Sequence, residues 1–290
     1  MKGLIVMNAY PNGEKFYRQS DRIKTELEKL GVKTDVLLNG EIAVTLDEIG
    51  EVKTKAVEYD FVVYLDKDKY LSRLLEGAGL RLFNSAKAIE TCDDKMLTYL
   101  ALKGKGVKIP ETISAPLCYT PNATPQKNFL DEVERLGFPL VAKKSYGSFG
   151  AGVELVKNRE ELEKKEKEWL YLPHFYQKFV GKKGQDIRVI VIGGKAVGAM
   201  ERIAVGDEFR SNIELGGKGE KIDLPIEYKQ TAEKVAQIIG LEYCGVDLLE
   251  GETPIVCEVN SNAFFEGLES VTGVNIAKLY AEYIINIMTK

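Results

Sequence analysis

The most informative stretch of the sequence is Cys244-Gly-Val-Asp-Leu-Leu-Glu-Gly-Glu-Thr-Pro-Ile-Val-Cys-Glu-Val-Asn260. Two apolar runs flank a Gly-Glu-Thr-Pro turn, which predicts a β-hairpin with strands over Cys244–Leu249 and Ile255–Asn260. Side chains alternate between the two faces of a strand, so one face of the hairpin is expected to enter a core. The residues expected on that face are Val246, Leu248, Cys257 and Val259.

The other face of this hairpin carries two carboxylates. If Glu250 pairs with Ile255, Asp247 lies directly opposite Glu258, and Asn260 lies on the same face two residues further on. Carboxylates about 5 Å apart repel each other, whereas a divalent cation between them turns the repulsion into attraction. Two carboxylates and an amide oxygen form an oxygen set that suits Mg²⁺. The alternative is an exposed face whose charges water screens, and this segment alone does not decide between the two.

Arginines gather in the two strands predicted just before the hairpin, over Asp186–Ile192 and Ala196–Ile203. The first carries Asp186-Ile-Arg188 and the second Glu201-Arg202, and Arg210-Ser-Asn212 follows. Guanidinium groups suit bidentate contacts with carboxylates or phosphates. A single arginine is more often a surface ion-pair residue, but the crowding of three beside the hairpin favours a site.

A glycine-rich loop, Ser145-Tyr-Gly-Ser-Phe-Gly-Ala-Gly152, follows a strand predicted over Pro139–Lys143 and precedes one over Val153–Val156. Glycines let backbone N–H groups approach phosphate oxygens, and a lysine at the strand end adds a positive charge. The order G-x-x-x-x-G-K-[ST] of a P-loop is absent. On this evidence alone, a flexible β-hairpin is the better interpretation.

The first third of the chain alternates strands and helices. Apolar runs predict strands over Gly3–Asn8, Val32–Leu38 and Phe61–Leu65, with a helix over Phe16–Leu30 between the first two. This is the pattern of a Rossmann-like layered unit. No G-x-G-x-x-G follows the first strand, so a dinucleotide site is not expected.

Helices are predicted in five other places. One is the charge run over Arg159–Glu168, where acidic and basic residues at i,i+4 spacing indicate a solvated helix face. The spacing Thr91-Cys-Asp-Asp94 predicts an N-cap at Thr91 for a helix ending near Leu102. Thr124 is expected to cap another helix, which ends before Gly137. The last two helices are predicted over Glu227–Ile239 and Asn275–Met288.

Composition narrows the class of protein. The 290 residues are 44% hydrophobic and 29% charged, with a formal net charge of −4, which suggests about two soluble domains and neither a nucleic-acid nor a membrane partner. The single histidine, His174, excludes a multi-histidine zinc site, and the four cysteines form no C-x-x-C pair. No apolar run reaches the ~20 residues of a membrane span. A cytoplasmic protein with reduced cysteines is expected.

In their order along the chain, these motifs resemble the ATP-grasp superfamily. The stretches that carry the resemblance are Lys95, Val141-Ala-Lys143, Gly147-Ser-Phe-Gly-Ala-Gly-Val153, Asp186-Ile-Arg188, Glu201-Arg202, Arg210-Ser-Asn212, Gly245-Val-Asp247 and Glu258-Val-Asn260. The chain is most similar to the RimK-like alpha-L-glutamate ligases, through Phe209-Arg-Ser-Asn212 and Glu266-Gly-Leu-Glu-Ser-Val-Thr-Gly273. The match covers residues 85 to 285, and the combination is far more specific than any single motif.

The resemblance implies an α/β and α+β fold in three parts. A Rossmann-like N-terminal (pre-ATP-grasp) domain is expected over residues 1–93, ahead of a two-lobed ATP-grasp fold. The central ATP-grasp lobe, with the glycine loop, is expected over residues 94–178. The C-terminal ATP-grasp lobe, with the metal site, is expected over residues 179–290.

The resemblance also implies roles for individual residues. The implied ATP-binding residues are Lys95, Lys143, Gly147, Ser148, Phe149, Gly150, Gly152, Lys178, Phe179, Val180, Asp186 and Asn212. The implied ligands of Mg²⁺ are Asp247, Glu258 and Asn260, with two ions expected and Mn²⁺ as an alternative. The implied catalytic residues, facing the reacting carboxylate and the acyl phosphate, are Arg188, Arg202 and Arg210.

The activity implied is an ATP-dependent carboxylate–amine ligase that forms an amide or peptide bond through an acyl phosphate, using L-glutamate or another amino acid. Two alternatives remain: an ATP-grasp kinase that phosphorylates an alcohol, and a non-catalytic ATP-binding module. Where RimK-like proteins usually read Asn-x-Ser-Pro-Gly, this chain has Asn260-Ser-Asn-Ala-Phe264. That departure leaves the acid and the amine acceptor open. The substrates are expected to be small molecules or peptides, and the protein a dimer or tetramer.

Overall fold

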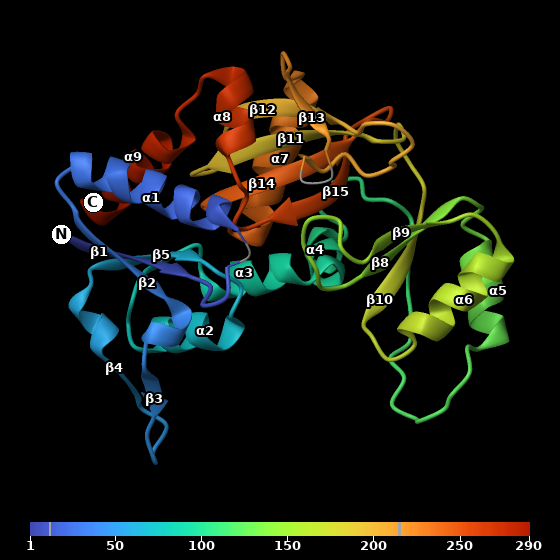
Figure 1. Ribbon diagram of the computed structural model, residues 1–290, viewed down its shortest axis with the longest axis horizontal. Coiled ribbons are helices and arrows are strands. Elements are labelled where there is room, and N and C mark those ends of the chain that lie inside the picture. The colour runs from blue at the N-terminus through green and yellow to red at the C-terminus, as the bar shows by residue number, and fades with distance from the viewer. Residues whose placement is uncertain (12, 214–215) are drawn as a thin grey trace.

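The computed structural model describes residues 1–11, 13–213 and 216–290. Its N-terminal part is a parallel sheet of order β2-β1-β5-β6. The elements of this part are β1 (Lys2–Met7), α1 (Glu14–Lys29), β2 (Lys33–Leu38), η1 (Asn39–Glu41), β3 (Val44–Leu46), β4 (Val52–Thr54), η2 (Lys55–Glu58), β5 (Phe61–Leu65), α2 (Lys69–Gly77), β6 (Leu82–Phe83) and α3 (Ala86–Asp93). The short hairpin β3–β4 projects away from the rest of the molecule (Figure 1).

The middle part is an antiparallel sheet of order β7-β10-β8-β9. Its elements are α4 (Lys95–Leu102), β7 (Thr112–Ser114), α5 (Lys127–Glu134), β8 (Leu140–Lys144), β9 (Val153–Val156), α6 (Arg159–Trp169) and β10 (His174–Lys178). Helices α5 and α6 cover the outer side of this sheet (Figure 1). Leu130, Val133, Leu162 and Trp169 from the helices form its core with Leu140 and Tyr176 from the strands.

The C-terminal part is an antiparallel sheet of order β13-β12-β11-β14-β15. Its elements are β11 (Gln185–Ile192), β12 (Lys195–Ile203), β13 (Lys218–Lys221), α7 (Ile226–Ile239), β14 (Tyr243–Leu249), β15 (Ile255–Asn260), α8 (Glu266–Thr272) and α9 (Ile276–Met288). Helix α7 packs on one face, where Val235 and Ala236 meet Val189 and Val246.

The other face of the C-terminal sheet shares a core with the N-terminal sheet. Ile5, Ile23 and Phe61 belong to the same buried cluster as Tyr243 and Tyr280. Helices α1 and α9 pack against each other across this junction (Figure 1). One sheet of four or five strands lies in each of the three segments predicted from the sequence, and the first segment also holds the two-stranded sheet β3-β4. The limits of these segments coincide with the ends of α3 and β10. The division into domains stays a prediction.

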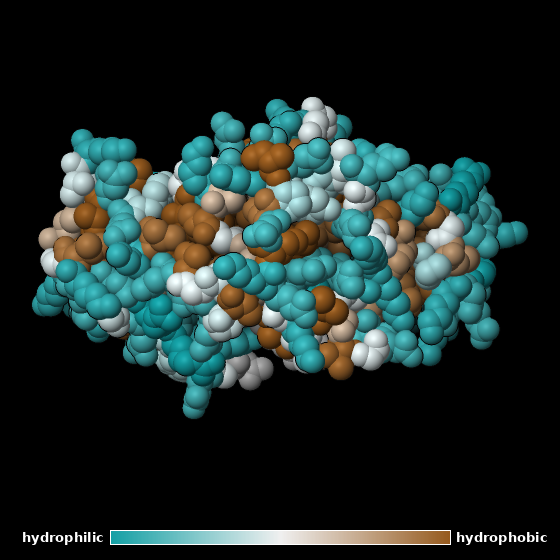
Figure 2. Space-filling view, turned by 90° about the horizontal axis from the view of Figure 1, so that it is seen from above, coloured by the Kyte–Doolittle hydropathy of each residue, from teal (hydrophilic) through white to brown (hydrophobic). Residues whose placement is uncertain are grey.

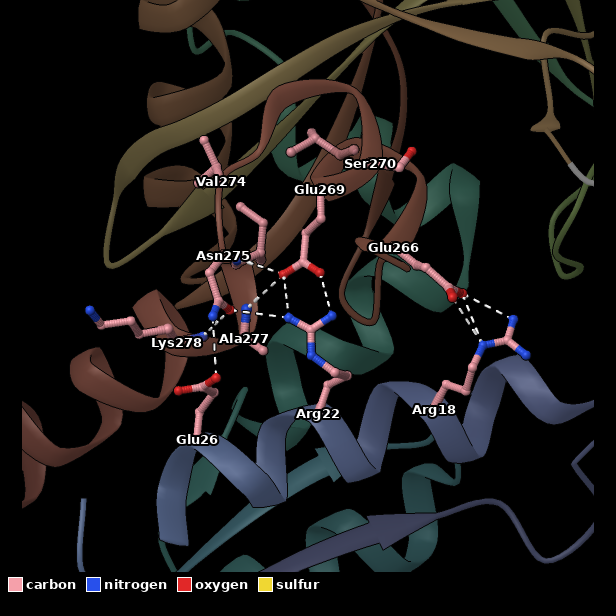
Figure 3. Close-up of polar contacts among 12 residues, drawn as sticks. Arg18, Arg22, Glu26, Glu266, Glu269, Ser270, Val274, Asn275, Ala277 and Lys278 are labelled. Carbon is pink, nitrogen blue, oxygen red and sulfur yellow. Dashed lines mark hydrogen bonds and ion pairs between the residues drawn. The ribbon is translucent and has the colours of Figure 1, made fainter. Parts of the chain in front are cut away.

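Ion pairs reinforce the junction between α1 and α8. Arg18 contacts Glu266 through Nε and Nη2, and Arg22 contacts Glu269 at 2.7 Å (Figure 3). Glu269 also accepts the backbone N–H of Ile276 at the start of α9. The α1 helix is therefore fixed to the segment that directly follows β15.

The surface is mostly hydrophilic on the face shown in Figure 2, with apolar residues exposed in a band along its middle. Among the described residues, none of the helices combines the length and the apolar character needed to cross a bilayer.

Most predicted elements match the structure to within one or two residues. The strands over Phe61–Leu65, Val153–Val156 and Ile255–Asn260 have the predicted bounds. The hairpin β3–β4, helices α2 and α8, and strands β6, β7, β10 and β13 were not predicted.

Two predicted helix starts are wrong. Helix α3 already occupies Ala86–Asp93, so Thr91 is not an N-cap. Asp94 caps α4 instead, because its carboxylate accepts the N–H groups of Met96 and Leu97. Helix α5 likewise begins at Lys127 without a side-chain cap, and Thr124 precedes it.

Candidate active site

A row of charged side chains crosses the C-terminal sheet. Arg202 of β12 is paired with Asp186 of β11, and Arg188 of β11 with Asp247 of β14. Asp247 in turn lies opposite Glu258 of β15. Residues opposite each other on neighbouring strands share a face, so four strands contribute to one charged surface. The predicted pairing of Asp247 with Glu258 is confirmed.

Asp247 lies between two arginines. Arg188 donates from Nε and Nη2 to the two carboxylate oxygens, both at 2.7 Å, and Arg202 Nη2 lies 2.8 Å from Oδ2. Arg202 also binds Asp186 through Nε at 2.7 Å. Burial alone would raise the pKa of Asp247, but the two guanidinium groups lower it to about 2. Asp247 is therefore a carboxylate at neutral pH.

The hairpin contains a β-bulge that the sequence did not predict. Leu249, rather than Glu250, pairs with Ile255, and the register shifts before Asp247 meets Glu258. Cys257 is the extra residue in β15. The predicted position of Cys257 in the core is wrong, because a bulge turns the extra residue out of strict alternation. Its sulfur instead lies 3.8 Å from Lys143 Nζ, beside the charged row.

Two buried lysines face the charged row. Lys95, the first residue of α4, donates from Nζ to the carbonyl oxygen of Gly147 at 2.7 Å and lies 3.5 Å from Glu258. Lys143 of β8 is 6% exposed. Burial opposes its charge, yet the pKa of Lys143 is raised because Cys257, Tyr99 and Glu258 stabilise the ammonium form. Lys143 is therefore a cation that faces the site, and Lys95 faces it from the start of α4.

Most of the predicted site residues line two cavities. The first of these cavities lies between the middle and C-terminal sheets. Val141 and Phe179 contribute apolar surface, and Lys143 and Arg202 contribute charge. The predicted site residues that line it are Lys95, Lys143, Gly150, Lys178, Phe179, Val180, Asp186, Arg202, Arg210, Asn212, Asp247 and Glu258. Apolar walls next to buried cations suit a flat ring joined to an anionic chain.

The second cavity lies where the N-terminal sheet meets the glycine loop and the C-terminal sheet. The predicted site residues that line it are Ser148, Phe149, Arg188, Asn212, Glu258 and Asn260. Asn212 and Glu258 line both cavities, so these two side chains form part of a shared wall. Within the described part of the chain, Gly147 and Gly152 are the only predicted site residues that line neither of the two cavities. The individual roles of all these residues stay predictions.

The glycine loop is attached to all three parts of the molecule. Lys95 binds the Gly147 carbonyl, Lys67 donates to Ser148 Oγ at 3.1 Å, and Arg210 donates to the Gly150 carbonyl at 2.9 Å. Glycine is required at Gly147, where φ is +135° and a Cβ would lie 2.8 Å from the carbonyl oxygen of Ala151.

The tip of this loop joins an aromatic cluster. Phe149 has a φ of +58°, which is uncommon for a residue other than glycine. Its ring lies 6.3 Å from that of Phe16 of α1 and 5.9 Å from that of Phe264, measured between centroids. Lys15 Nζ lies 3.6 Å from the centre of the Phe149 ring. These contacts hold the loop over the second cavity.

The oxygen atoms of the predicted metal set fit Mg²⁺. A carboxylate has about four acceptor positions, of which the two arginines use three on Asp247. Glu258 contacts only Lys95 among the described ion pairs. The side-chain nitrogen of Asn260 is buried without a hydrogen-bond partner. Acceptor positions therefore remain on both carboxylates for a cation. The unpartnered Asn260 nitrogen is a donor, so it would contact an oxygen of a ligand and not the metal ion.

The sequence reasoning missed the N-terminal contribution to the second cavity. Asn8, Asp66 and Lys67 line it, together with Tyr10 and Phe16. Asn8 and Asp66 directly follow the parallel strands β1 and β5. Ligands bind outside the carboxyl ends of strands in open α/β sheets, so polar residues at these positions were a usable signal.

Comparison with known proteins adds a family match. A profile described as the RimK-like ATP-grasp domain matches residues 92–284. The chain is 34% identical over 234 residues to N-acetylaspartylglutamate synthase A of Homo sapiens, covering 78% of this chain and 58% of that protein. It is 34% identical over 289 residues to the probable alpha-L-glutamate ligase of Rhodopirellula baltica, covering 91% of this chain and 67% of that one. The chain thus spans less than two thirds of the length of the human relative.

Solved structures match over nearly the whole chain. D-alanine–D-alanine ligase from Bacillus anthracis, complexed with ATP, superposes with a TM-score of 0.75 at 21% identity, over 100% of this chain and 97% of that one. The ATP-grasp ligase PsnB, complexed with a phosphomimetic variant of its minimal precursor, Mg and ADP, gives a TM-score of 0.70 at 19% identity, over 99% and 98% of the two chains. At these identities the match bears on the fold, and the expected ATP-grasp fold is confirmed.

Proposed function

The chain belongs to the RimK-like ATP-grasp family, and from that premise we propose that it joins a carboxylate to an amine at the expense of ATP and releases ADP. The observation that carries this proposal is the wall shared by the two cavities. Glu258 and Asn212 face the cavity with the buried lysines and also the cavity that Arg188 lines. A phosphate group on one side and a carboxylate on the other would meet there.

In this proposal ATP occupies the first cavity. Phe179 and Val180 supply apolar surface for adenine, and Lys95 and Lys143 neutralise phosphate oxygens. The ion pairs of Asp186 and Asp247 with Arg202 and Arg188 cancel in charge, so the buried lysines leave the site with positive charge for an anion. Attraction of this kind gains strength where water is excluded.

The proposed reaction has two steps. A carboxylate oxygen attacks the γ-phosphorus of ATP, the bond to the β-phosphate oxygen breaks, and an acyl phosphate and ADP form. The amine then attacks the acyl carbon, phosphate leaves with the electrons of the C–O bond, and the nitrogen loses a proton. Both steps depend on positioning and charge neutralisation. Arg188 and Lys67 are both cations that line the second cavity, and we assign Arg188 to the reacting carboxylate.

Magnesium completes the proposed site. Asp247, Glu258 and Asn260 would hold it, and when bound it neutralises phosphate charge. We propose two ions, with Mn²⁺ as an alternative. We further propose that L-glutamate is a substrate, because the names of the relatives refer to glutamate ligases and N-acetylaspartylglutamate synthase. Small-molecule or peptide substrates, a cytoplasmic location and a dimer or tetramer complete the proposal.

Hydroxylamine trapping tests this function. The protein, Mg-ATP and hydroxylamine are incubated with carboxylic acids that include L-glutamate, and hydroxamate and ADP are measured. Hydroxylamine intercepts an acyl phosphate whatever the natural amine is, so we expect a hydroxamate that disappears in Glu258→Gln. ADP release that depends on an alcohol and yields a stable phosphoester would contradict the ligase and select a kinase. ATP binding without turnover on any acid would select a binding module.

A further inference from the structure

Three polar side chains converge at the carboxyl edge of the N-terminal sheet. Asn8 directly follows β1, Asn39 follows β2, and Asp66 follows β5. The last residues of these strands are in register, because Met7 pairs with both Leu38 and Leu65. The order β2-β1-β5-β6 reverses direction between β1 and β5. Such a switch point is where open α/β sheets bind ligands.

The two asparagines direct their N–H groups at Asp66. Asn8 Nδ2 donates to Asp66 Oδ1 at 3.0 Å, and Asn39 Nδ2 donates to Oδ2 at 2.7 Å. The amide oxygens are turned away, since Asn8 Oδ1 accepts the N–H of Tyr10 and Asn39 Oδ1 accepts that of Ala9. Four hydrogen bonds therefore fix the orientation of the carboxylate.

Within the described part of the chain, the hydrogen-bond partners of Asp66 are neutral. It is 7% exposed, and among the residues that the structure describes, neither a lysine nor an arginine forms an ion pair with it. The adjacent Lys67 turns instead to Asp93, at 3.1 Å, and to Ser148. The two asparagines use two of the roughly four acceptor positions of a carboxylate. A buried anion without a counter-ion is costly, so the site favours a cation that brings its own N–H donors.

The surroundings select the kind of cation. Asp66 lines the second cavity beside the apolar surfaces of Leu65 and Phe16, and Arg188 lines the same cavity. The oxygens of Asn8 and Asn39 are already engaged, so the edge offers one carboxylate and too few free oxygens for a divalent ion. A primary ammonium group has three N–H donors and a single charge, which matches the acceptor positions left on Asp66.

We propose that Asp66, held by Asn8 and Asn39, is a specificity residue that binds the primary ammonium group of an amino-acid substrate. The proposal rests on the proposed ligase function and gives the N-terminal sheet a role in it. Asp66 and Arg188 line the same cavity, so one amino acid would place its ammonium at Asp66 and its carboxylate near Arg188. The ammonium belongs either to the amine that receives the acyl group, which loses a proton before its nitrogen attacks, or to the acid that is activated.

The test compares Asp66→Asn with the wild-type protein on pairs of compounds that differ only in the ammonium group: L-glutamate and glutarate, L-aspartate and succinate. Hydroxamate formation gives the KM for each compound as the acid, and amide formation gives the KM for L-glutamate as the amine. Binding of both members of each pair, with Mg²⁺ and a non-hydrolysable ATP analogue, is measured by calorimetry. The matched control is Glu48→Gln, which removes one negative charge from an exposed position in the hairpin β3–β4.

We expect Asp66→Asn to raise the KM or the dissociation constant of the amino acid roughly 10- to 100-fold, the loss expected for one charged hydrogen-bond partner. The KM for ATP and the binding of the partner without an ammonium should not change, which a misfolded variant would not reproduce. A shift in amide formation alone assigns the ammonium to the amine, and a shift in hydroxamate formation assigns it to the acid.

Equal effects of Asp66→Asn on both members of every pair, or no effect in any of the hydroxamate, amide and calorimetric measurements, would overturn the ammonium subsite. Failure of the proposed ligase function gives a different result, because the wild-type protein would then form no hydroxamate. Calorimetry would still test the ammonium subsite in that case, since it compares the binding of amino acids with that of their deaminated partners.

Discussion

At the scale of single residues, the site depends on charges that cancel in pairs and on a few that do not. Asp247 and Asp186 are engaged by arginines from neighbouring strands. Glu258 contacts only Lys95, at 3.5 Å, among the described ion pairs, and faces both cavities. Glu258 is therefore the carboxylate that remains most available to a metal ion.

Glu258→Gln should lower kcat by at least about 100-fold, the loss typical of a key electrostatic contact in a reacting site. The amide keeps the size of the side chain but removes the charge that a cation needs. ADP release and hydroxamate formation are the measurements. Glu252→Gln, in the exposed turn of the same hairpin, is the control and should keep wild-type activity. Substantial turnover by Glu258→Gln would refute the metal assignment.

Asp247→Asn should destabilise the protein by about 3–5 kcal/mol, since it removes one partner from a buried ion-pair network. The pKa of Asp247 is about 2 in the folded protein against an ordinary value of 3.8. Its contribution to stability is therefore complete above about pH 5 and is lost as the pH falls through 3.8 toward 2. Urea unfolding between pH 5 and 2.5 should show a shallower pH dependence in the variant. Parallel curves for the two proteins would contradict this account.

At the scale of elements, the glycine loop is a segment to which all three parts of the protein donate hydrogen bonds. Its tip residue, Phe149, contacts α1 through Phe16 and the segment after β15 through Phe264. Phe264 lies in the segment Asn260–Phe264, where the sequence departs from the usual family motif. The aromatic cluster thus joins this segment to the glycine loop.

Phe149→Ala should loosen the loop and admit water to the acyl phosphate. We expect the ratio of ADP released to amide formed to rise several-fold, with little change in the unfolding temperature. Coupled assays of ADP and amide product measure the ratio. Tyr119→Ala removes an aromatic side chain that is 84% exposed elsewhere on the middle part, and should leave the ratio unchanged. An unchanged ratio in Phe149→Ala would show that the cluster does not control water access.

At the scale of the whole molecule, the N-terminal sheet is held against the C-terminal part by a shared core and by ion pairs. The Arg22–Glu269 pair is partly buried, with Glu269 at 11% exposure, and Arg18–Glu266 is exposed on both sides. Glu269 also binds the start of α9, so its ion pair links three helices (Figure 3).

A double-mutant cycle on Arg22→Ala and Glu269→Ala should give a coupling energy of about 1 kcal/mol, at the upper end for ion pairs near a surface. The matched cycle on Arg18→Ala and Glu266→Ala should give a smaller coupling that 0.5 M salt removes. Chemical denaturation of the single and double variants measures both. Equal coupling energies in the two cycles would contradict the role assigned to burial.

The sequence by itself determined most of the strands and helices, the pairing of Asp247 with Glu258 and the family. Apolar alternation, glycine positions and the order of motifs are local properties, and a chain retains them whatever it packs against. These local signals wrongly placed Cys257 in the core, because the β-bulge there depends on how two strands pair. The alternation of apolar residues within one strand does not reveal such a bulge.

Only the tertiary structure brought together residues that lie far apart along the chain. Asn8, Asn39 and Asp66 meet because three parallel strands end at one edge, and Phe16, Phe149 and Phe264 meet because three separate parts pack together. Each of these side chains is ordinary within its own segment. Their chemistry arises from convergence, which depends on strand order and on packing between elements rather than on local sequence.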